Sequence, residues 1–427
     1  MRDLIHPADR LADAMDRIYR YRMTTTSGGN LSIRDDDGAL WITPARVDKG
    51  ALRRDDIVKV LPDGSFVGRH KPSSEFPFHH RIYEKRPDLR ALVHAHPVAL
   101  VAFSICGRCP DTRVFAKAHS ICGDVGFAPY ALPGSALLGE RIAEIFAQGH
   151  DCVMLENHGV VVGGRTFQEA FERFETLEFT AKTIVKATPL GDVVSLTDEQ
   201  LAAARDRGPT PETFEPGVAS EAERALRRDL CDFVQRGYEQ RLLISTEGTF
   251  SARISEDSFI ITPRRGDRAV LAPDDLVLVS QGRAEQGKVP SRAVGLHEAI
   301  YARHPSVHSI LNATPVNATA FAISAFPLDT RTIPESYIFL RDVPLLNSRE
   351  IYHDYQQLAA RLDPAFPVAL VANDGAMVLG TSILDAFDRL EVLEATAEAI
   401  LNARPLGDLK VMGNAVIDEL VEAFLKK

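Results

Sequence analysis

The sequence is poor in cysteine, and its five cysteines have no regular spacing. An odd count without a framework indicates free thiols in a reducing compartment rather than the disulfide scaffold of a secreted protein. Cys106 and Cys109 form a CxxC pair. No second pair follows it, so we expect ordinary thiols there rather than a zinc or redox site.

Basic residues are outnumbered by acidic ones, and long apolar runs are missing. The formal net charge of −10 argues against a surface that binds nucleic acid or an anionic membrane. No apolar run approaches the roughly 20 residues of a membrane span. Residues 1–20 have the pattern of an amphipathic helix and lack the apolar core of a signal peptide. We therefore expect a cytoplasmic protein with no nucleic-acid partner and no membrane partner.

The sequence does contain an internal duplication. The segment ITPARVDKGALRRDDIVKV (42–60) returns as ITPRRGDRAVLAPDDLVLV (261–279), and TPLGD (188–192) returns as RPLGD (404–408). The spacing between matching segments hardly changes along the chain. The 427 residues therefore contain two copies of one domain.

The composition between the copies predicts where they are joined. A stretch rich in Pro, Gly and Glu separates them and is typical of a linker. We predict a first domain at 1–195, a linker at 196–218 and a second domain at 219–427.

Both copies show the same order of secondary-structure patterns. An amphipathic helix comes first, followed by short β-like runs such as NLSIR (30–34) and TFSARI (249–254). A helix, a buried strand such as ALVHAHP (91–97), further helices and another apolar strand complete each copy. Mixed strands with helices between them predict an α/β fold built as a layered sandwich.

Closely spaced histidines occur in the first copy. His94 and His96 are separated by one residue, so in a strand both side chains point to the same face. Such a pair alone is more often two ordinary histidines. However, His158 lies at the polar exit of an apolar strand, and Glu75 follows two serines at a helix start. Three histidines with an open position form a catalytic zinc-like site, and a nearby carboxylate is the usual general base.

Two further segments have features of an anion site. SGGNLS (27–32) is a glycine-rich turn whose backbone N–H groups can form an anion nest. SSE (73–75) adds two hydroxyls and the N-terminus of a helix. Each segment taken alone is more often purely structural.

In series, the motifs SGGNLS, ITP, PSSE, HAH and ENHG resemble those of the class II (metal-dependent) aldolase and adducin head family. The resemblance covers 5–192 and, more weakly, about 220–410. It implies two α/β/α sandwich domains, each with a largely antiparallel central sheet. It also implies a divalent ion, commonly Zn²⁺ with Mn²⁺, Fe²⁺ or Co²⁺ as alternatives, bound by His94, His96 and His158.

The resemblance implies roles for other residues of the first copy. Glu75 would handle the proton next to the substrate carbonyl. The residues matching the family's phosphate or anion pocket are Gly29, Asn30, Ser73 and Ser74, and Thr43 and Arg46 are further candidate substrate-binding residues.

The implied activity is that of a metal-dependent lyase. Its substrate would be a small hydroxy-carbonyl compound with an anionic group, cleaved through a metal-stabilised enediolate. We rank retro-aldol cleavage first, then epimerisation, then decarboxylation. The rival hypothesis is a non-catalytic interaction protein, as adducin heads are; those heads lack the metal histidines.

Two departures from the family pattern leave the reaction type open. Arg46 stands where sugar-phosphate aldolases usually have glycine, and Phe115 stands at the position of the aldolase tyrosine. Lys117 and His119 lie where one family member, ribulose-phosphate 4-epimerase, has its polar acid and base groups. Both are therefore candidate catalytic residues.

The second copy has lost the chemistry of this constellation. Asn312, Thr314 and Asp374 stand at the positions of the three histidines, and Ala293 stands at that of Glu75. Neutral amide and hydroxyl groups are poor ligands for zinc-like ions, so we expect no metal there. The second copy would then serve assembly, regulation or the supply of residues to a neighbour.

The resemblance also implies an assembly. Single-domain family members form four-fold tetramers with active sites between neighbours, so two fused copies would rebuild the ring as a homodimer. The loop DTRVFAKAH (111–119) matches DTRTIPESY (329–337), which aligns Tyr337 with His119. We expect Tyr337 to act as a proton donor in the first-copy site of a neighbour; the alternative is a packed tyrosine in a turn.

Overall fold

The computed structural model describes residues 5–205, 210–324 and 326–426. The chain divides into two compact units. The first contains the residues up to Thr112 together with Lys117–Lys182, and the second contains Arg113–Ala116 and everything from Thr183 onward. Among the described residues, no helix has the length and apolar character needed to cross a membrane.

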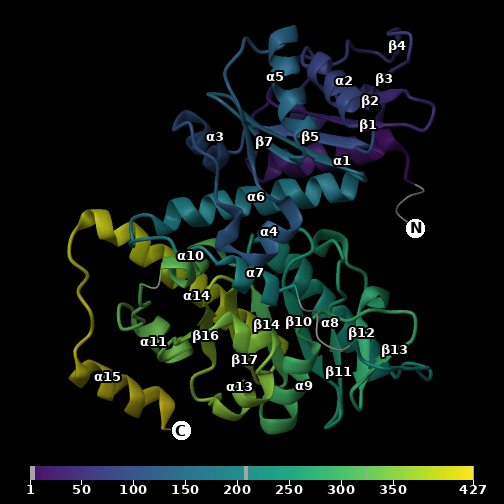
Figure 1. Ribbon diagram of the computed structural model, residues 1–427. Helices are drawn as coiled ribbons and strands as arrows, with labels where there is room; N and C mark the ends of the chain where they lie inside the picture. Colours follow the sequence, from purple (N-terminus) through teal and green to yellow (C-terminus); the bar gives the residue numbers. More distant parts are fainter. Residues whose placement is uncertain (1–4, 206–209, 325, 427) are drawn as a thin grey trace. The chain divides into compact units, whose positions relative to one another are not determined.

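The first unit is built around one mixed sheet (Figure 1). Its strands are β1 (Asn30–Arg34), β2 (Leu40–Ile42), β3 (Val58–Val60), β4 (Phe66–Val67), β5 (Ala91–Ala95), β6 (Gly126–Ala128), β7 (Cys152–Leu155) and β8 (Gly159–Gly164). They lie in the order β4-β3-β2-β1-β5-β8-β7-β6. Every neighbouring pair is antiparallel except β6 and β7, which are parallel.

Helices follow the strands in the order that the sequence predicts. They are α1 (Pro7–Arg20), α2 (Phe76–Lys85), α3 (Val98–Ile105), α4 (Ala116–Cys122), α5 (Ala136–Ala147) and α6 (Phe167–Ala187). The predicted amphipathic N-terminal helix is α1; residues 1–4 of that prediction lie outside the described residues.

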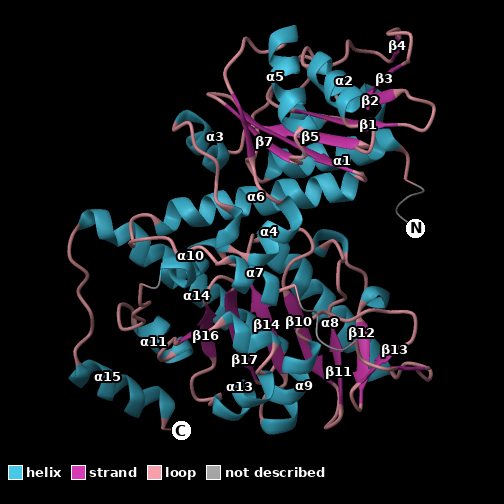
Figure 2. Ribbon diagram, in the orientation of Figure 1, coloured by secondary structure: helices cyan, strands magenta, loops and turns pink. Residues whose placement is uncertain are grey.

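Helices cover both faces of the first sheet. Along β5, Val93 packs in a buried cluster with residues of α1 and α6, whereas Leu92 packs in a separate cluster with residues of α2 and α5. Successive side chains of a strand point to opposite faces, so the two clusters lie on either side of the sheet. The predicted α/β/α sandwich with a largely antiparallel sheet is confirmed, as Figure 2 shows by the helices above and below the strands.

The second unit repeats this architecture. Its main strands are β10 (Thr249–Arg253), β11 (Ser258–Ile261), β12 (Val277–Ser280), β13 (Arg283–Glu285), β14 (Ser309–Ala313), β15 (Leu345–Leu346), β16 (Val368–Val371) and β17 (Gly375–Gly380). The sheet order is β15-β16-β17-β14-β10-β11-β12-β13-β9. It reproduces the order of the first sheet and adds β9 (Thr213–Phe214) at one edge. The pairs β15–β16 and β13–β9 are parallel, and the other pairs are antiparallel.

The helices of the second unit follow the order of those in the first, with α12 and α15 as additions. They are α8 (Glu221–Glu239), α9 (Val294–Arg303), α10 (Val316–Ser324), α11 (Pro334–Leu340), α12 (Ser348–Tyr352), α13 (Tyr355–Arg361), α14 (Ile383–Ala403) and α15 (Asn414–Leu420), followed by a π-helical turn at Val421–Leu425. Residues of α9 and α13 share one buried cluster with residues of the strands. Helix α8 contacts β10, and helix α14 contacts β17.

Part of the segment predicted as a linker forms secondary structure in the second unit. It contains α7 (Asp198–Ala203) and β9 (Thr213–Phe214), and β9 pairs with β13 at the sheet edge. Residues 206–209 of the predicted linker lie outside the described residues. The domain boundaries at 195 and 219 stay predictions.

Candidate metal centre

The sheet register determines the surroundings of His94. This residue ends β5 with its neighbour Ala95, opposite Asn30 on one side and Val161 on the other. Its Nδ1–H donates to the carbonyl oxygen of Val160 at 2.9 Å. A ring nitrogen that donates to a carbonyl fixes the orientation of the imidazole and leaves Nε2 for a ligand.

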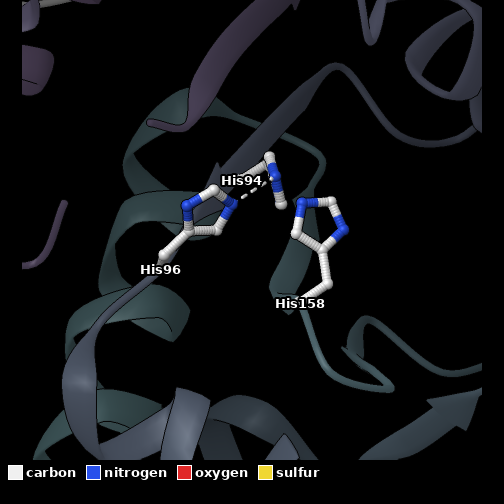
Figure 3. A group of neighbouring side chains, drawn as sticks. All are labelled: His94, His96 and His158. Carbon is white, nitrogen blue, oxygen red and sulfur yellow. Dashed lines mark hydrogen bonds between the residues drawn. The ribbon is translucent and has the colours of Figure 1, made fainter. Parts of the chain in front are cut away.

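His96 and His158 bring their rings next to that of His94. The three ring centroids lie 4.8, 4.9 and 4.9 Å apart, and Figure 3 shows the three side chains gathered in one place. One nitrogen from each ring lies within 4.8 Å of the other two, and the Nε2 atoms of His94 and His96 are 3.1 Å apart. This is the only such group of potential ligands in the part of the chain that the structure describes.

The turn between β7 and β8 holds His158 in place. Its backbone N–H donates to Ser104 Oγ at 3.0 Å, and that hydroxyl donates to the carbonyl of Leu155 at 2.7 Å. Gly159 follows directly; a Cβ there would lie 2.6 Å from the carbonyl oxygen of Ala95 and 2.7 Å from the His96 ring. Glycine is therefore needed for the turn to approach the end of β5.

Glu75 lies at the start of α2 with its carboxylate against the triad. Its Oε2 is 3.2 Å from His94 Nε2, and its Oε1 is 3.5 Å from His158 Nε2. Burial raises the pKa of Glu75, but His94, His158 and the amide of Asn30 outweigh this and leave the pKa well below its usual range. The carboxylate is therefore ionised, as a general base requires.

The residues present fit a divalent cation. Burial together with the adjacent His94 lowers the pKa of His96 to about 3 and that of His158 to about 4, so both rings are neutral at physiological pH. A histidine side chain binds a metal ion only as the neutral imidazole. In addition, Glu75 Oε1 is buried without a hydrogen-bond partner. Three imidazole nitrogens beside an anionic oxygen are a donor set that favours a cation.

A buried hydrogen-bond network lies behind Glu75. Asn30 Nδ2 donates to Glu75 Oε2 at 2.7 Å, and the Oδ1 of the same amide contacts His79 Nε2. His79 Nδ1 lies 2.7 Å from Ser32 Oγ, which lies 2.8 Å from the hydroxyl of Tyr83. Our sequence analysis missed His79, Ser32 and Tyr83. The available signal was that the second copy has the same three residue types at the matching positions.

The predicted anion-site residues surround the same region. Gly29 has φ +71°, and a Cβ there would lie 2.7 Å from the carbonyl oxygen of His94, so the turn before β1 requires glycine. Ser73 is buried, and its Oγ accepts from the backbone N–H of Glu75 at 3.2 Å. Thr43 is buried as well, and its hydroxyl accepts from Leu31 N at 3.1 Å.

The other two predicted anion-site residues are exposed. Arg46 has φ +57°, in the left-handed region that favours glycine. Ser74 lies between Ser73 and Glu75 at the surface. Their roles in binding a substrate stay predictions.

Lys49 is a buried cation that the sequence analysis overlooked. Its Nζ donates to the carbonyl oxygen of Pro44 at 2.6 Å. Burial lowers its pKa to about 8, although the charge of Glu75 acts in the opposite direction. In the second unit, Arg268 holds the corresponding carbonyl of Pro263 at 3.2 Å. A cation at this position therefore supports the same loop in both copies.

The remaining candidates lie elsewhere. His119, on α4, places Nδ1 3.2 Å from Thr112 Oγ1. Lys117 lies on the same helix, and Tyr337 lies on α11 of the second unit. Among the described residues, no hydrogen bond or ion pair joins His119 to the histidine triad. The catalytic roles of these three residues stay predictions.

The corresponding region of the second unit has different chemistry on the same backbone. Thr249 pairs with Asn312 in the register that joins Asn30 to His94. Asn312 Oδ1 lies 2.6 Å from His297 Nε2. Thr314 Oγ1 is buried without a hydrogen-bond partner.

Comparison with known proteins gives the same assignment to both copies. A family model described as the Class II Aldolase and Adducin N-terminal domain matches residues 9–185 and again 228–401. The chain belongs to this family. The two matches confirm the tandem arrangement and place the triad in the first class II aldolase domain.

Several enzymes of the family are similar to this chain. A 3-oxo-tetronate 4-phosphate decarboxylase of Pectobacterium atrosepticum is 39% identical over 38% of this chain and 75% of that protein. An L-fuculose phosphate aldolase of Methanocaldococcus jannaschii is 32% identical over 39% and 88% of the two chains. A solved structure of an L-fuculose 1-phosphate aldolase is 29% identical over 46% of this chain and 92% of that chain, with a TM-score of 0.43.

Proposed function

We propose that the first class II aldolase domain is a divalent-metal-dependent lyase that breaks a C–C bond next to a carbonyl group. The observation that carries this proposal is an ionised, half-buried carboxylate in contact with two of three converging imidazoles, those of His94 and His158. A non-catalytic adducin-like role needs none of these groups. The substrate we propose is a small hydroxy-carbonyl compound with an anionic group such as phosphate.

His94, His96 and His158 would bind the ion. When bound, it supplies Lewis-acid stabilisation of the negative charge that develops on the carbonyl oxygen, worth several kcal/mol. We propose Zn²⁺ as the ion, because three neutral imidazoles with an open position are its usual catalytic ligand set.

Glu75 would exchange a proton with the carbon next to the carbonyl. Its carboxylate is ionised and partly buried, and Asn30 donates to one oxygen, so the other oxygen is available for the proton. The glycine turn at Gly29 and the Ser73 region would bind the anionic group through backbone N–H and hydroxyl donors.

Retro-aldol cleavage is the reaction we favour. Decarboxylation of a 3-oxo acid phosphate is the second candidate, because similar proteins include 3-oxo-tetronate 4-phosphate decarboxylases as well as fuculose-phosphate aldolases. Both reactions leave charge next to the carbonyl after the C–C bond breaks, so the same ion and carboxylate serve either. Phe115 at the aldolase tyrosine position is compatible with the second candidate, which releases CO₂ and forms no aldehyde whose hydroxyl proton must be removed.

A product assay tests the proposal and separates the two reactions. Metal-stripped protein is reloaded with Zn²⁺, Mn²⁺ or Co²⁺ and incubated with ketose 1-phosphates and with 3-oxo acid phosphates. An aldehyde and a ketone phosphate would support retro-aldol cleavage, whereas CO₂ would support decarboxylation. Metal-loaded protein that forms neither product and exchanges no carbon-bound proton with D₂O would overturn the proposal.

We also propose that the protein acts as a homodimer in which the second domain completes a site. The loop that carries Tyr337 matches the loop that carries the aldolase tyrosine in the family. In a neighbouring chain's first domain, this tyrosine would exchange a proton with the oxygen of the aldehyde fragment, removing the hydroxyl proton in cleavage and donating it in the reverse direction.

A further inference from the structure

The donor direction of every hydrogen bond behind Glu75 is fixed by chemistry. An ionised carboxylate only accepts, so the Asn30 Nδ2 must be the donor in that contact. The other end of the same amide, Oδ1, only accepts, so His79 donates through Nε2–H. Neutral imidazole has one N–H, and His79 Nδ1 must then accept from the hydroxyl of Ser32.

His79 is held in this single tautomer. Its side chain is fully buried on α2, four positions after Glu75. Burial, with a contribution from His94, lowers its pKa to about 3, so the ring stays neutral. The hydroxyl of Ser32, having donated to His79, accepts from the Tyr83 hydroxyl at 2.8 Å. The network is therefore fully ordered from Tyr83 to Glu75.

We propose that His79 is a positioning residue that fixes the amide of Asn30, and through it the carboxylate of Glu75, for proton transfer. This inference rests on the proposed role of Glu75 in the lyase reaction. Without the His79 donor, the Asn30 amide can rotate and present its oxygen to the carboxylate. Two acceptors would then face each other, and Glu75 would lose its fixed orientation toward the substrate carbon.

The second domain keeps the network without the base. Ser251 Oγ lies 2.7 Å from His297 Nδ1 and 2.7 Å from the hydroxyl of Tyr301. There His297 Nε2 contacts Asn312 Oδ1 at 2.6 Å, because Thr249 at the Asn30 position instead contacts Ser291 Oγ at 2.5 Å. His297 therefore provides a matched control with the same burial and with partners of the same types, a serine hydroxyl and an asparagine oxygen, although its asparagine stands at the His94 position.

Two substitutions at His79 separate positioning from packing. The amide of asparagine reaches the position of imidazole Nδ1, so His79→Asn keeps a contact with Ser32 and loses the donor to Asn30. The amide of glutamine reaches the position of Nε2, so His79→Gln keeps that donor. We expect His79→Asn to lower kcat roughly 10–100-fold, with KM and metal content within about twofold of the wild type. His79→Gln should recover most of the lost kcat.

The control variant is His297→Asn. We expect it to lower the thermal stability of its domain as His79→Asn does, with kcat unchanged. Wild-type kcat in His79→Asn would overturn the proposal. So would equal losses of kcat in His79→Asn, His79→Gln and His297→Asn, because they would show a packing effect alone.

A measurement without substrate tests the network itself. In metal-free protein with ¹⁵N-labelled histidine, the signal lost in His79→Asn should be a neutral imidazole protonated at Nε2, unchanged from pH 6 to pH 8. Protonation at Nδ1 would overturn the proposal. If Glu75→Gln kept full turnover, the proposed function would fail, while this tautomer measurement would still decide whether His79 donates to Asn30.

Discussion

The two domains pair their central strands in the same register and present different side chains from it. In the first, β1 and β5 place Asn30 opposite His94; in the second, β10 and β14 place Thr249 opposite Asn312. In both, a buried histidine, serine and tyrosine stay hydrogen-bonded behind the sheet.

The two domains share the residues that stabilise the fold and differ in the residues that we assign to the chemistry. The buried network is also present in the second domain, whose described residues include no metal triad and have alanine at the Glu75 position. It therefore contributes to packing and satisfies buried polar groups. The metal ligands and the base occupy strand ends and turns, where substitution leaves the backbone unchanged. The two copies therefore differ at few positions of the site, and the second copy provides an internal control for the first.

The largest difference between the domains should appear on removing a metal ligand. We expect His96→Ala to release the ion and to lower turnover by roughly a thousandfold or more, since Lewis-acid stabilisation is worth several kcal/mol. The matched variant Thr314→Ala in the second domain should keep both ion and turnover. Metal analysis and initial rates of the two variants check this. A similar loss of activity in Thr314→Ala would erase the proposed contrast.

The next effect concerns the base. Glu75→Gln keeps the size of the side chain and removes the charge, so the ion should stay bound while turnover falls by roughly two to four powers of ten. The rate of exchange between the substrate's carbon-bound proton and D₂O should fall in parallel. The control is Asp374→Asn, which removes a carboxylate at the second-domain position that matches His158, with turnover near that of the wild type. Rapid exchange in Glu75→Gln would assign the proton transfer to another group.

A smaller effect tests whether Tyr337 of the second domain completes the first-domain site of a neighbouring chain. We expect Tyr337→Phe to lower kcat roughly 100-fold with the ion retained, the lower end of general acid catalysis. Tyr130→Phe, at an exposed tyrosine of the first domain, is the control. Mixed dimers of His96→Ala and Tyr337→Phe chains should regain activity, because one site then has both an ion and a phenol. Mixed dimers with no more activity than either single variant would rule out a contribution of Tyr337 to the site of a neighbouring chain.

The smallest effect is on acid stability and concerns the second domain alone. Burial lowers the pKa of His297 to about 4, against about 6.5 in the unfolded chain. Between these values the unfolded chain binds a proton that the folded domain does not, so stability rises with pH. The free energy of unfolding of the second domain should therefore be highest, as far as His297 is concerned, above about pH 6.5. It should fall by on the order of 3 kcal/mol as the pH is lowered toward 4.

Urea unfolding between pH 4.5 and pH 7.5 checks this expectation. His297→Gln removes the titrating group, so the transition of the second domain should depend less on pH than in the wild type. The transition of the first domain, which keeps His79, serves as the reference. An unchanged pH dependence in His297→Gln would show that another group titrates in this window.

Much of the fold was predictable from the sequence because the two copies repeat the same patterns. The run ALVHAHP has the alternation and apolar content of a buried strand, and it forms β5. Short edge strands such as β4 and β6 have too few residues for a periodic signal, and β9 lies in a stretch whose composition is typical of a linker.

The candidate site was predictable only in part. His94, His96 and His158 were identified because three ligands of one chemical type occur in recognisable motifs, and the structure brings them together. His79 was missed because its role depends on the strand register that brings Asn30 to its Nε2, which a helix pattern alone does not reveal. Lys49 was missed because lysine is rarely buried and its burial depends on the loop at Pro44.

The most direct test of the central contrast is the metal content of the full chain. The protein is stripped, reloaded with Zn²⁺, dialysed and measured by elemental analysis beside the variant His94→Ala/His96→Ala/His158→Ala. We predict about one tightly bound ion per chain in the wild type, from the single triad among the described residues, and close to none in the triple variant. Two ions per wild-type chain, or one ion retained by the triple variant, would contradict the account.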